Sequence, residues 1–436
     1  MITIGIMSGN SFNTLKAVMT EFQGSHINDI VGFIEPFTPK FKENLKNLQK
    51  EIEQADFDME QIVKTPLFKK VLANYTTLVI KAVENLIKKS NVKRKDIAAI
   101  GLSGLPFGTI KDKQGTFTTQ IFNPSRLAKA TGIDVVYDFF SDDVFNGGAG
   151  APFMSIHNLH LSARLTTEGH FPICFLNGGS TANLTLITQG SSIKKQVFGF
   201  DCGAFNYYIR ALCRYFFGKE NDYNSDLAMN GQINPQLLKE LYEESAITPN
   251  GENFYNLTPP KFADWHSYRM MSKLRNSPLR PEDILRTVEY FAAYSVFLSL
   301  QFIPEHFDYP KCFVTFGDGW NNPLVYYDFQ NLLHGRGFIL PEHHELARGI
   351  LSHTRGINFE FGSSDYFGIR SDFMDAREMA DMAYCCLINQ PFNRQEVTGC
   401  QEECVCGIVC RSGAYQRRSG RGYTYSRAAK GWNAFD

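Results

Sequence analysis

Short apolar runs alternate along the chain with longer segments in which apolar residues recur at helical spacing. The short runs predict buried strands, whereas recurrence every three to four residues predicts helices. The predicted strands are residues 2–7, 96–102, 173–177, 182–187 and 312–316. The predicted helical stretches are residues 41–89 and 281–302. Strands that alternate with helices in this way predict an α/β fold.

Three of the predicted strands run directly into glycine turns. The turns contain Ser8 to Ser11, Gly178 with Gly179, and Gly317 with Gly319. Glycine turns at strand ends leave backbone N–H groups directed at a ligand, and phosphate is the ligand best matched to several such donors. A single turn of this kind more often serves the chain reversal alone. Three in an ordered series favour phosphate binding where the turns converge.

The length of the chain predicts two domains, because 436 residues exceed what one hydrophobic core usually holds. A glycine cluster at residues 147–152 lies near the end of the first strand–helix pattern, and a second pattern starts at residue 173. We therefore predict a first lobe of residues 1–135 completed by about residues 385–410, and a second lobe of residues 136–384. Residues 411–436 are rich in Ser, Gly, Arg and Tyr, which is typical of a disordered basic tail.

The charge balance argues against two classes of partner. Lys plus Arg number 44 and Asp plus Glu number 45, so the net field gives no reason to expect nucleic acid or an anionic membrane. The opening MITIGIMSGN lacks the basic leader of a signal peptide, and no apolar run reaches membrane-spanning length. A cytoplasmic protein with a small-molecule ligand is the resulting expectation.

The chain has ten cysteines, which we interpret mostly as reduced thiols. Four of them, Cys400, Cys404, Cys406 and Cys410, offer the number of ligands that a structural zinc ion takes. Their irregular spacing differs from the paired spacing typical of zinc sites, and no histidine is near. Free thiols are the favoured interpretation, and we predict no protein-held metal site.

In order and spacing, the motifs resemble the anhydro-N-acetylmuramic acid kinase family from residue 5 to about residue 409. Residues 5–11 are similar to the first phosphate hairpin of the family and residues 177–184 to its second. The other matching segments are residues 147–152 (sugar-side loop), 199–206 (catalytic segment), 317–323 (nucleotide turn), Glu378 with Ala383 (a helix closing the nucleotide pocket) and 397–399 (closing motif).

The resemblance implies an actin-like fold of two lobes with a duplicated mixed-sheet core. It implies that Mg-ATP and a sugar bind in the cleft between the lobes. The family also suggests a homodimer. The resemblance assigns Asp201 as the base that takes a proton from water while the anhydro ring opens. O6 of the sugar receives the phosphoryl group. The implied product is N-acetylmuramic acid 6-phosphate, which serves cell-wall recycling. Without the resemblance, Asp201 would be interpreted as capping a turn. The implied nucleotide and phosphate ligands are Ser8, Gly9, Asn10, Ser11, Asn177, Gly178, Gly179, Gly317, Gly319, Asn322 and Glu378. The implied sugar ligands are Gly104, Asp138, Gly148, Gly150 and Asn206.

Several positions depart from the family pattern, mainly where the family contacts sugar. Ser103 to Pro106 replace a histidine-glycine-glutamine-threonine segment of which only Gly104 survives, and Phe140 stands where the family has an arginine. Arginine reads carboxylates with two parallel hydrogen bonds, and phenylalanine does not. Three hypotheses therefore stay open: an active kinase for the family's sugar, a kinase for a different sugar, and a degenerate member that has lost activity.

Overall fold

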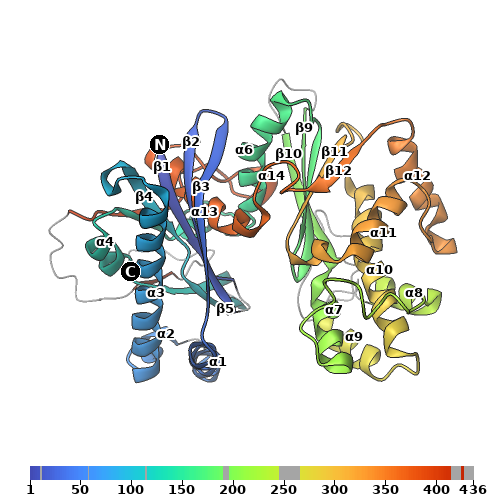
Figure 1. Ribbon diagram of the computed structural model, residues 1–436, viewed down its shortest axis with the longest axis horizontal. Helices are drawn as coiled ribbons and strands as arrows, with labels where there is room; N and C mark the ends of the chain where they lie inside the picture. The colour runs from blue at the N-terminus through green and yellow to red at the C-terminus, as the bar shows by residue number, and fades with distance from the viewer. Residues whose placement is uncertain are drawn as a thin grey trace. The chain divides into compact units, whose positions relative to one another are not determined.

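The computed structural model describes residues 1–9, 12–56, 58–112, 115–189, 196–244, 266–413 and 424–426. It divides into two compact units: residues 1–163 with 372–436, and residues 164–371. Each unit contains a mixed β-sheet flanked by helices (Figure 1). Among the described residues, no helix combines the length and apolar character needed to cross a membrane.

The first unit is built on a six-stranded sheet in the order β13-β7-β4-β1-β2-β3. Its strands are β1 (Ile2–Met7), β2 (Thr14–Gln23), β3 (His26–Pro36), β4 (Ile97–Leu102), β7 (Val135–Tyr137) and β13 (Ile408–Cys410). Its helices are α1 (Pro39–Gln54), α2 (Met59–Ile62), α3 (Pro66–Ser90), α4 (Pro124–Thr131), α5 (Phe139–Phe145), α6 (Met154–Thr167, shared with the second unit), α13 (Met374–Leu387) and α14 (Gln395–Thr398). A smaller sheet contains β5 (Leu105–Asp112), β6 (Gly115–Phe122) and β14 (Thr424–Ser426).

The second unit is built on a five-stranded sheet in the order β10-β9-β8-β11-β12. Its strands are β8 (Ile173–Gly178), β9 (Thr181–Thr188), β10 (Gln196–Ala204), β11 (Cys312–Phe316) and β12 (Glu360–Ser363). Its other helices are α7 (Asn206–Leu212), α8 (Pro235–Glu244), α9 (His266–Arg275), α10 (Pro281–Ser299), α11 (Pro323–Leu333) and α12 (His344–Thr354).

The five strands of the second sheet repeat the topology of five strands of the first. In the first, β1 pairs antiparallel with β2, β2 pairs antiparallel with β3, and β1, β4 and β7 are parallel. In the second, β8, β9 and β10 repeat the antiparallel meander, and β8, β11 and β12 are parallel. This repetition confirms the predicted α/β class with a duplicated mixed-sheet core of the actin-like type.

Four helices begin with the same two-residue device. A threonine or asparagine side chain accepts a hydrogen bond from the first helical turn, and a proline follows it at the first helical position. The pairs are Thr38-Pro39 before α1, Thr65-Pro66 before α3, Asn123-Pro124 before α4 and Asn322-Pro323 before α11. The sequence therefore specifies these helix starts locally.

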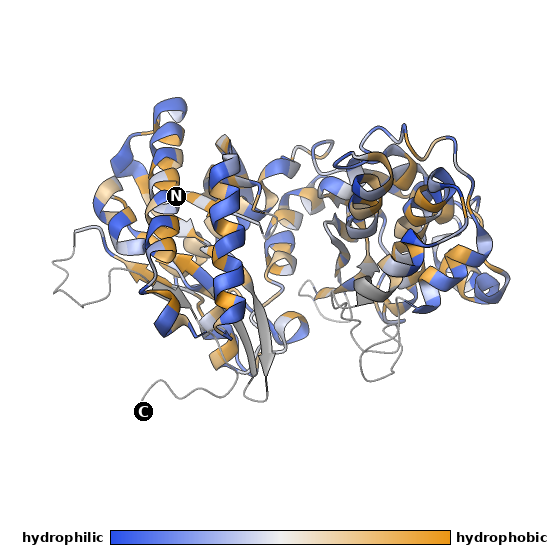
Figure 2. Cartoon of the chain, turned by 90° about the horizontal axis from the view of Figure 1, so that it is seen from below, coloured by the Kyte–Doolittle hydropathy of each residue, from blue (hydrophilic) through white to orange (hydrophobic). Residues whose placement is uncertain are grey.

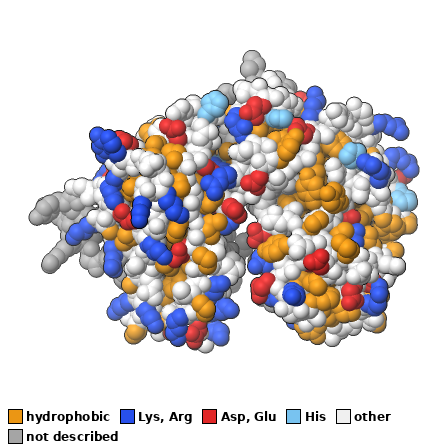
Figure 3. All heavy atoms as spheres, in the orientation of Figure 1, with side chains coloured by type: hydrophobic (Ala, Val, Ile, Leu, Met, Phe, Trp, Pro, Cys, Tyr) orange, Lys and Arg blue, Asp and Glu red, His pale blue; other side chains and the backbone are white. Residues whose placement is uncertain are grey.

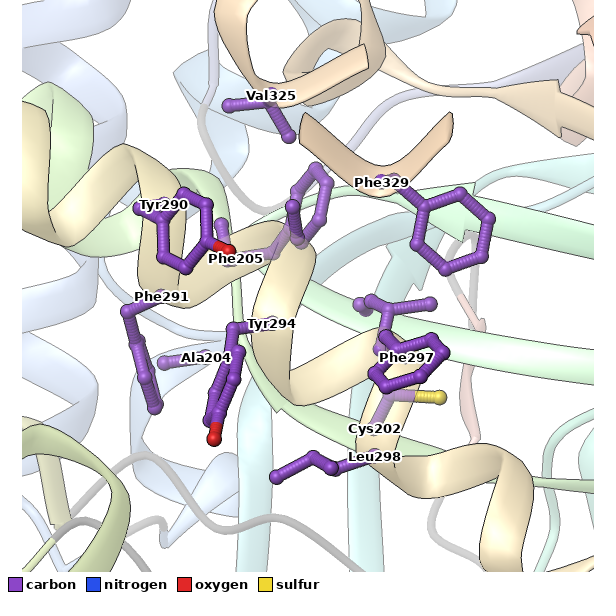
Figure 4. Packing of buried hydrophobic residues seen from close by; sticks show 14 of the residues in the cluster. Cys202, Ala204, Phe205, Tyr290, Phe291, Tyr294, Phe297, Leu298, Val325 and Phe329 are labelled. Carbon is purple, nitrogen blue, oxygen red and sulfur yellow. The ribbon is translucent and has the colours of Figure 1, made fainter. Parts of the chain in front are cut away.

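The core of the second unit forms around α10, which is buried at every position from Ile284 to Ser299 except the half-buried Arg286. A helix buried on nearly all sides belongs in an interior. Aromatic side chains of α10 lie against Cys202 and Ala204 of β10 and against Phe329 of α11 (Figure 4). Outer helices of both units instead show mixed hydrophilic and hydrophobic positions (Figure 2).

The boundaries between the units differ from the predicted ones. They fall at residues 163/164 and 371/372, rather than at 135/136 and 384/385. The first shift arises because β7, which the expected boundary divides, pairs with β4 inside the first sheet. The second arises because α13 packs on the first sheet: a Cβ on Gly5 would lie 1.7 Å from the carbonyl oxygen of Ala376. Most of the predicted disordered tail lies outside the described residues, although residues 424–426 pair with β6.

Candidate functional site

Two glycine turns of the second unit pack directly on one another. β8 and β11 are parallel neighbours, with Asn177 opposite Phe316, so their carboxyl ends meet at one edge of the sheet. Gly317 has φ 92°, and a Cβ there would lie 2.8 Å from both Asn177 Oδ1 and the Gly178 carbonyl oxygen. A Cβ on Gly319 would lie 3.0 Å from that same oxygen. The structure thus brings together the second and third turns that the sequence singled out.

Two aromatic rings lie against these turns. Phe205 and Trp320 have ring centroids 4.9 Å apart. A Cβ on Gly178 would lie 2.6 Å from Trp320 Cδ1, and one on Gly319 would lie 2.5 Å from Phe205. Close packing alone therefore explains glycine at positions 178, 317 and 319, without any ligand.

Gly9 and Gly179 have no such internal reason to be glycine. Neither has a positive φ, and among the described residues no atom lies within 4 Å of where a Cβ on Gly9 would stand. A Cβ on Gly179 would make one ordinary contact, 3.5 Å from the Thr181 carbonyl oxygen. Open space over a glycine backbone suits a ligand that approaches the main chain closely. Gly9 and Gly179 are therefore the strongest phosphate-contact candidates, each in its own unit.

The first turn is described only in part. Ser8 is fully buried, and among the described residues its hydroxyl makes no hydrogen bond of ordinary geometry, although the Tyr75 hydroxyl is a neighbour. The Phe12 amide donates to the Gly9 carbonyl at 3.2 Å, which closes the turn. Asn10 and Ser11, the other predicted ligands here, lie outside the described residues.

Asp201 lies inside β10, opposite Asn183 of β9. Successive side chains of a strand point to opposite faces, and the neighbouring Phe200 and Cys202 belong to the core around α10. The half-buried Asp201 therefore faces away from that core. The strand register shifts between Asp201 and Gly203, which is a bulge. Because Asp201 is a strand residue, the alternative that it caps a turn is wrong.

The segment after Asp201 is tied to the second glycine turn. The Phe205 amide donates to the Ser180 carbonyl at 2.9 Å, and the Asn206 amide donates to the Gly179 carbonyl at 3.1 Å. Asn206 is buried and starts α7. Backbone bonds thus link the segment that contains Asp201 to the turn that contains Gly179.

In the first unit, Asp143 organises the glycine loop that resembles the family's sugar-side loop. Its buried carboxylate accepts hydrogen bonds from the Gly150 amide at 2.7 Å, from Thr398 Oγ1 at 2.6 Å and from Asn393 Nδ2 at 2.9 Å. A Cβ on Gly148 would lie 2.2 Å from this carboxylate. Asp143 keeps a family-like place in the sequence but is not among our predicted sugar ligands, and the partners of its carboxylate lie up to 255 positions away in sequence.

Two other predicted sugar ligands also have internal contacts. Asp138 has φ 55° and accepts a 2.7 Å hydrogen bond from the Ser141 hydroxyl. Gly104 lies so close to β6 that a Cβ would be 2.4 Å from Phe122. Both positions are therefore shaped by the fold of the first unit.

The side chain of Asn322 has a structural task, while its role in nucleotide binding stays a prediction. Its Oδ1 accepts from the Val325 amide at 3.1 Å, as the cap of α11, and from the Ser225 hydroxyl at 2.9 Å. Its Nδ2 donates to the Asp222 carbonyl at 3.0 Å and to Glu289 Oε1 at 2.7 Å. Both amide protons are used inside the protein, so none is left for a ligand.

Glu378 lies on α13, the helix that packs on the first sheet. Burial is the main cause that raises the pKa of this carboxyl well above its usual value, and the charges of Asp375 and Asp381 raise it further. A buried carboxyl of this kind holds its proton. Glu378 is therefore a buried residue in the interior of the first unit.

The positions that depart from the family are engaged in internal contacts. Ser103 is buried; its carbonyl accepts a 3.1 Å hydrogen bond from the Tyr75 hydroxyl, and its own hydroxyl accepts one of 3.3 Å from Gln120. Phe140 packs against Phe153 with ring centroids 5.6 Å apart. Where the family presents polar sugar contacts, this chain has buried bonds and aromatic packing.

The four C-terminal cysteines do not gather into one site. Cys410 Sγ lies 3.9 Å from the Ser125 hydroxyl, and Cys406 Sγ lies 3.7 Å from the Cys404 carbonyl oxygen. Across the part of the chain that the structure describes, these four sulfurs contribute to no group of three close metal-ligand atoms. The zinc alternative for this cluster therefore has no support.

Comparisons with known proteins place the chain in a family. A sequence model of the anhydro-N-acetylmuramic acid kinase family matches residues 1–342. The anhydro-N-acetylmuramic acid kinase of Hahella chejuensis is 28% identical over 414 residues, which cover 94% of this chain and 98% of that protein. The enzyme of the same name from Pseudomonas fluorescens is 27% identical over 412 residues, covering 93% of this chain and 98% of that protein.

Among solved structures, a ROK family glucokinase from Streptomyces griseus in complex with glucose and AMPPNP covers 88% of this chain and 99% of its own. Its sequence identity is 13% and its TM-score 0.33, values too low to carry an argument about this chain. The family match is different in kind, because it extends over well more than half of the sequence. The chain belongs to the anhydro-N-acetylmuramic acid kinase family.

Proposed function

We propose that the protein is an ATP-dependent kinase that phosphorylates a 1,6-anhydro amino sugar, with anhydro-N-acetylmuramic acid as the first substrate to test. Family membership supports the reaction class. The observation that carries the proposal is local to the second unit: the open backbone of Gly179 is joined by backbone bonds to the segment that follows Asp201. The backbone bonds therefore link the turn that we propose to contact phosphate to the segment that we propose to carry the catalytic carboxylate.

The residues of the second unit fit a nucleotide and its metal ion. The unobstructed main chain at Gly179 suits the close approach of phosphate oxygens. Asp318 is exposed in the adjacent turn and offers the oxygen ligand that Mg²⁺ prefers. Mg²⁺ bound with ATP would neutralise the negative charge of the phosphates. Positioning and charge neutralisation are the main requirements of phosphoryl transfer.

Asp201 is the proposed general base. It takes a proton from a water molecule while the water oxygen bonds to the anomeric carbon of the sugar. The bond between that carbon and O6 breaks, O6 takes the γ-phosphoryl group, and ADP leaves. The product of the family's sugar is N-acetylmuramic acid 6-phosphate.

A second candidate is the same reaction on a different sugar. The internal contacts of Ser103 and Phe140 favour it, because these positions no longer present the polar groups of the family. Each lost hydrogen bond removes about 0.5–1.5 kcal/mol from sugar binding. A substrate without the lactyl carboxylate needs no partner in place of the missing arginine.

The test is ADP production by the purified full-length protein with ATP, Mg²⁺ and either anhydro-N-acetylmuramic acid or anhydro-N-acetylglucosamine, which lacks the lactyl group. In ¹⁸O-labelled water, the first proposal predicts one heavy oxygen on the sugar carbon skeleton and none in the phosphate. Turnover with the second sugar alone would support the altered-substrate candidate. ATP binding without turnover on either sugar would contradict both candidates.

A further inference from the structure

Four metal-ligating side chains meet between two helices of the first unit. His157 and His160 are three positions apart on α6, and Asp381 and Cys385 are four positions apart on α13. Each spacing places the two side chains on one face of its helix. His157 Nδ1 and His160 Nδ1 each lie 2.8 Å from Asp381 Oδ2, and Cys385 Sγ lies 3.6 Å from Asp381 Oδ1. One carboxylate is therefore surrounded by two imidazoles and a thiol.

The cluster is closed on one side and accessible on the other. The side chains of His157 and Asp381 are exposed by 0% and 1%, whereas that of His160 is exposed by 20%. His160 Nε2, the nitrogen that points away from Asp381, lies 3.4 Å from Gln390 Nε2. An ion can thus reach the cluster past His160, whose ring orientation Gln390 helps to fix.

Two observations distinguish this cluster from an ordinary buried ion pair. One ligand atom each of His160, Asp381 and Cys385 lies within 4.8 Å of the other two, so a single ion can contact all three. The buried Nε2 of His157 has no hydrogen-bond partner among the described atoms, so the network leaves part of its polar capacity unused. An ion pair requires neither the thiol nor a second imidazole.

We propose that His160, Asp381 and Cys385 bind one divalent transition-metal ion of the zinc class, with a water molecule as the fourth ligand. Imidazole and thiolate select such ions over Mg²⁺ or Ca²⁺. On binding, the Cys385 thiol releases its proton to solvent. His160 Nδ1 also gives up the proton with which it bonds Asp381 in the ion-free protein, the neutral ring then carries its single proton on Nε2, and Nδ1 offers its lone pair to the ion. The ion joins α6 to α13, the helix that covers Gly5 and Gly101 of the first sheet. The cluster belongs to the first unit, whereas Gly179 belongs to the second.

The experiment uses Co²⁺ as a spectroscopic probe of the metal-stripped full-length protein. A cysteine ligand gives a thiolate-to-cobalt charge-transfer band, which we expect to saturate at one Co²⁺ per chain. Cys385→Ser should abolish that band, and His160→Ala should weaken Co²⁺ binding by more than about tenfold, the least that loss of even an outer-shell partner usually costs. Cys386→Ser and Cys404→Ser are matched controls, because these sulfurs lie outside the group, and both should leave the band unchanged.

Three results would overturn the proposal. The first is absence of the band in the unaltered protein, and the second is a band that survives Cys385→Ser. The third is a band that disappears instead in Cys312→Ser, because Cys312 belongs to another candidate group, with His170 and Glu360. If Cys385→Ser fails to fold, the partly exposed His160→Ala carries the test. Unchanged Co²⁺ affinity in that variant would then overturn the assignment.

Discussion

At the scale of single residues, the glycines of the turns divide into two kinds. Gly317 has φ 92° and no room for a side chain, whereas Gly179 has neither constraint. Gly317→Ala should lower the free energy of unfolding by about 2 kcal/mol or more, because a left-handed backbone is costly for alanine and the new methyl group clashes. Gly179→Ala should change it by less than about 0.5 kcal/mol, yet weaken ATP binding.

Urea unfolding and titration with a non-hydrolysable ATP analogue separate these effects. Gly349→Ala on α12 is the control, because a Cβ there would meet no atom of the described chain within 4 Å. Full ATP affinity in Gly179→Ala would remove the main support for a phosphate contact at this turn.

Glu289 predicts a pH dependence of stability. Burial, followed by the charge of Asp222, raises the pKa of this carboxyl well above its usual value. Because the folded state holds the proton more tightly, the contribution of Glu289 to stability is fully present below the unfolded pKa and is lost as the pH rises through the folded one. Each unit of difference between the pKa of Glu289 in the folded state and in the unfolded state corresponds to about 1.4 kcal/mol of unfolding free energy.

Glu289→Gln keeps an acceptor for Asn322 and removes the titration, so we expect it to be more stable than the unaltered protein at pH 8 but not at pH 4. Urea unfolding at both pH values measures the difference. Glu345→Gln, at an exposed position of α12, should show no such change. A Glu289→Gln variant with the same pH dependence as the parent would show that Glu289 stays ionised in the fold.

At the scale of elements, the contact between α13 and the first sheet depends on two glycines. A Cβ on Gly5 would lie 1.7 Å from the Ala376 carbonyl oxygen, and one on Gly101 would lie 2.0 Å from that of Met379. The atoms that the new methyl groups would meet belong to the backbone of α13, so they can move away only if the helix moves. Gly5→Ala should therefore lower the free energy of unfolding by about 3 kcal/mol or more. A loss below about 1 kcal/mol in urea unfolding would mean that α13 does not pack on β1 as described.

The sequence predicts elements well where one local pattern decides them. The strands that end in glycine turns were predicted because they are short, apolar and abruptly terminated. The hairpin of β2 and β3 was missed, because β3 alternates exposed and half-buried residues without a strong apolar run. Asn322 was assigned to the nucleotide because it follows a glycine turn, although an asparagine before a proline equally starts a helix.

Sequence spacing carries no information on contacts between distant segments. His157 and Asp381 are 224 positions apart, and Asp143 meets Thr398 across 255 positions. These contacts exist only once α6, α13 and the C-terminal segment have folded onto the first sheet. The candidate metal site and the support of the glycine loop therefore could not be predicted from the chain alone.

At the scale of the whole molecule, the near balance of 44 basic and 45 acidic residues agrees with a small-molecule ligand. Basic and acidic side chains are scattered over the face shown in Figure 3. Family membership and the duplicated sheet topology support the kinase reaction class, while the altered residues of the first unit concern the choice of sugar. We propose that the chemistry depends on Asp201 and that the sugar specificity depends on the altered residues.

The most direct measurement is sugar-dependent ADP production by the full-length protein and by its Asp201→Asn variant, with Asp308→Asn as the control at an exposed carboxylate of the same unit. Loss of a general base typically costs about 10²–10⁴-fold in rate. The account predicts a loss of this size for Asp201→Asn, with ATP binding retained, and an unchanged rate for Asp308→Asn. An Asp201→Asn variant that turns over sugar at the parental rate would contradict it.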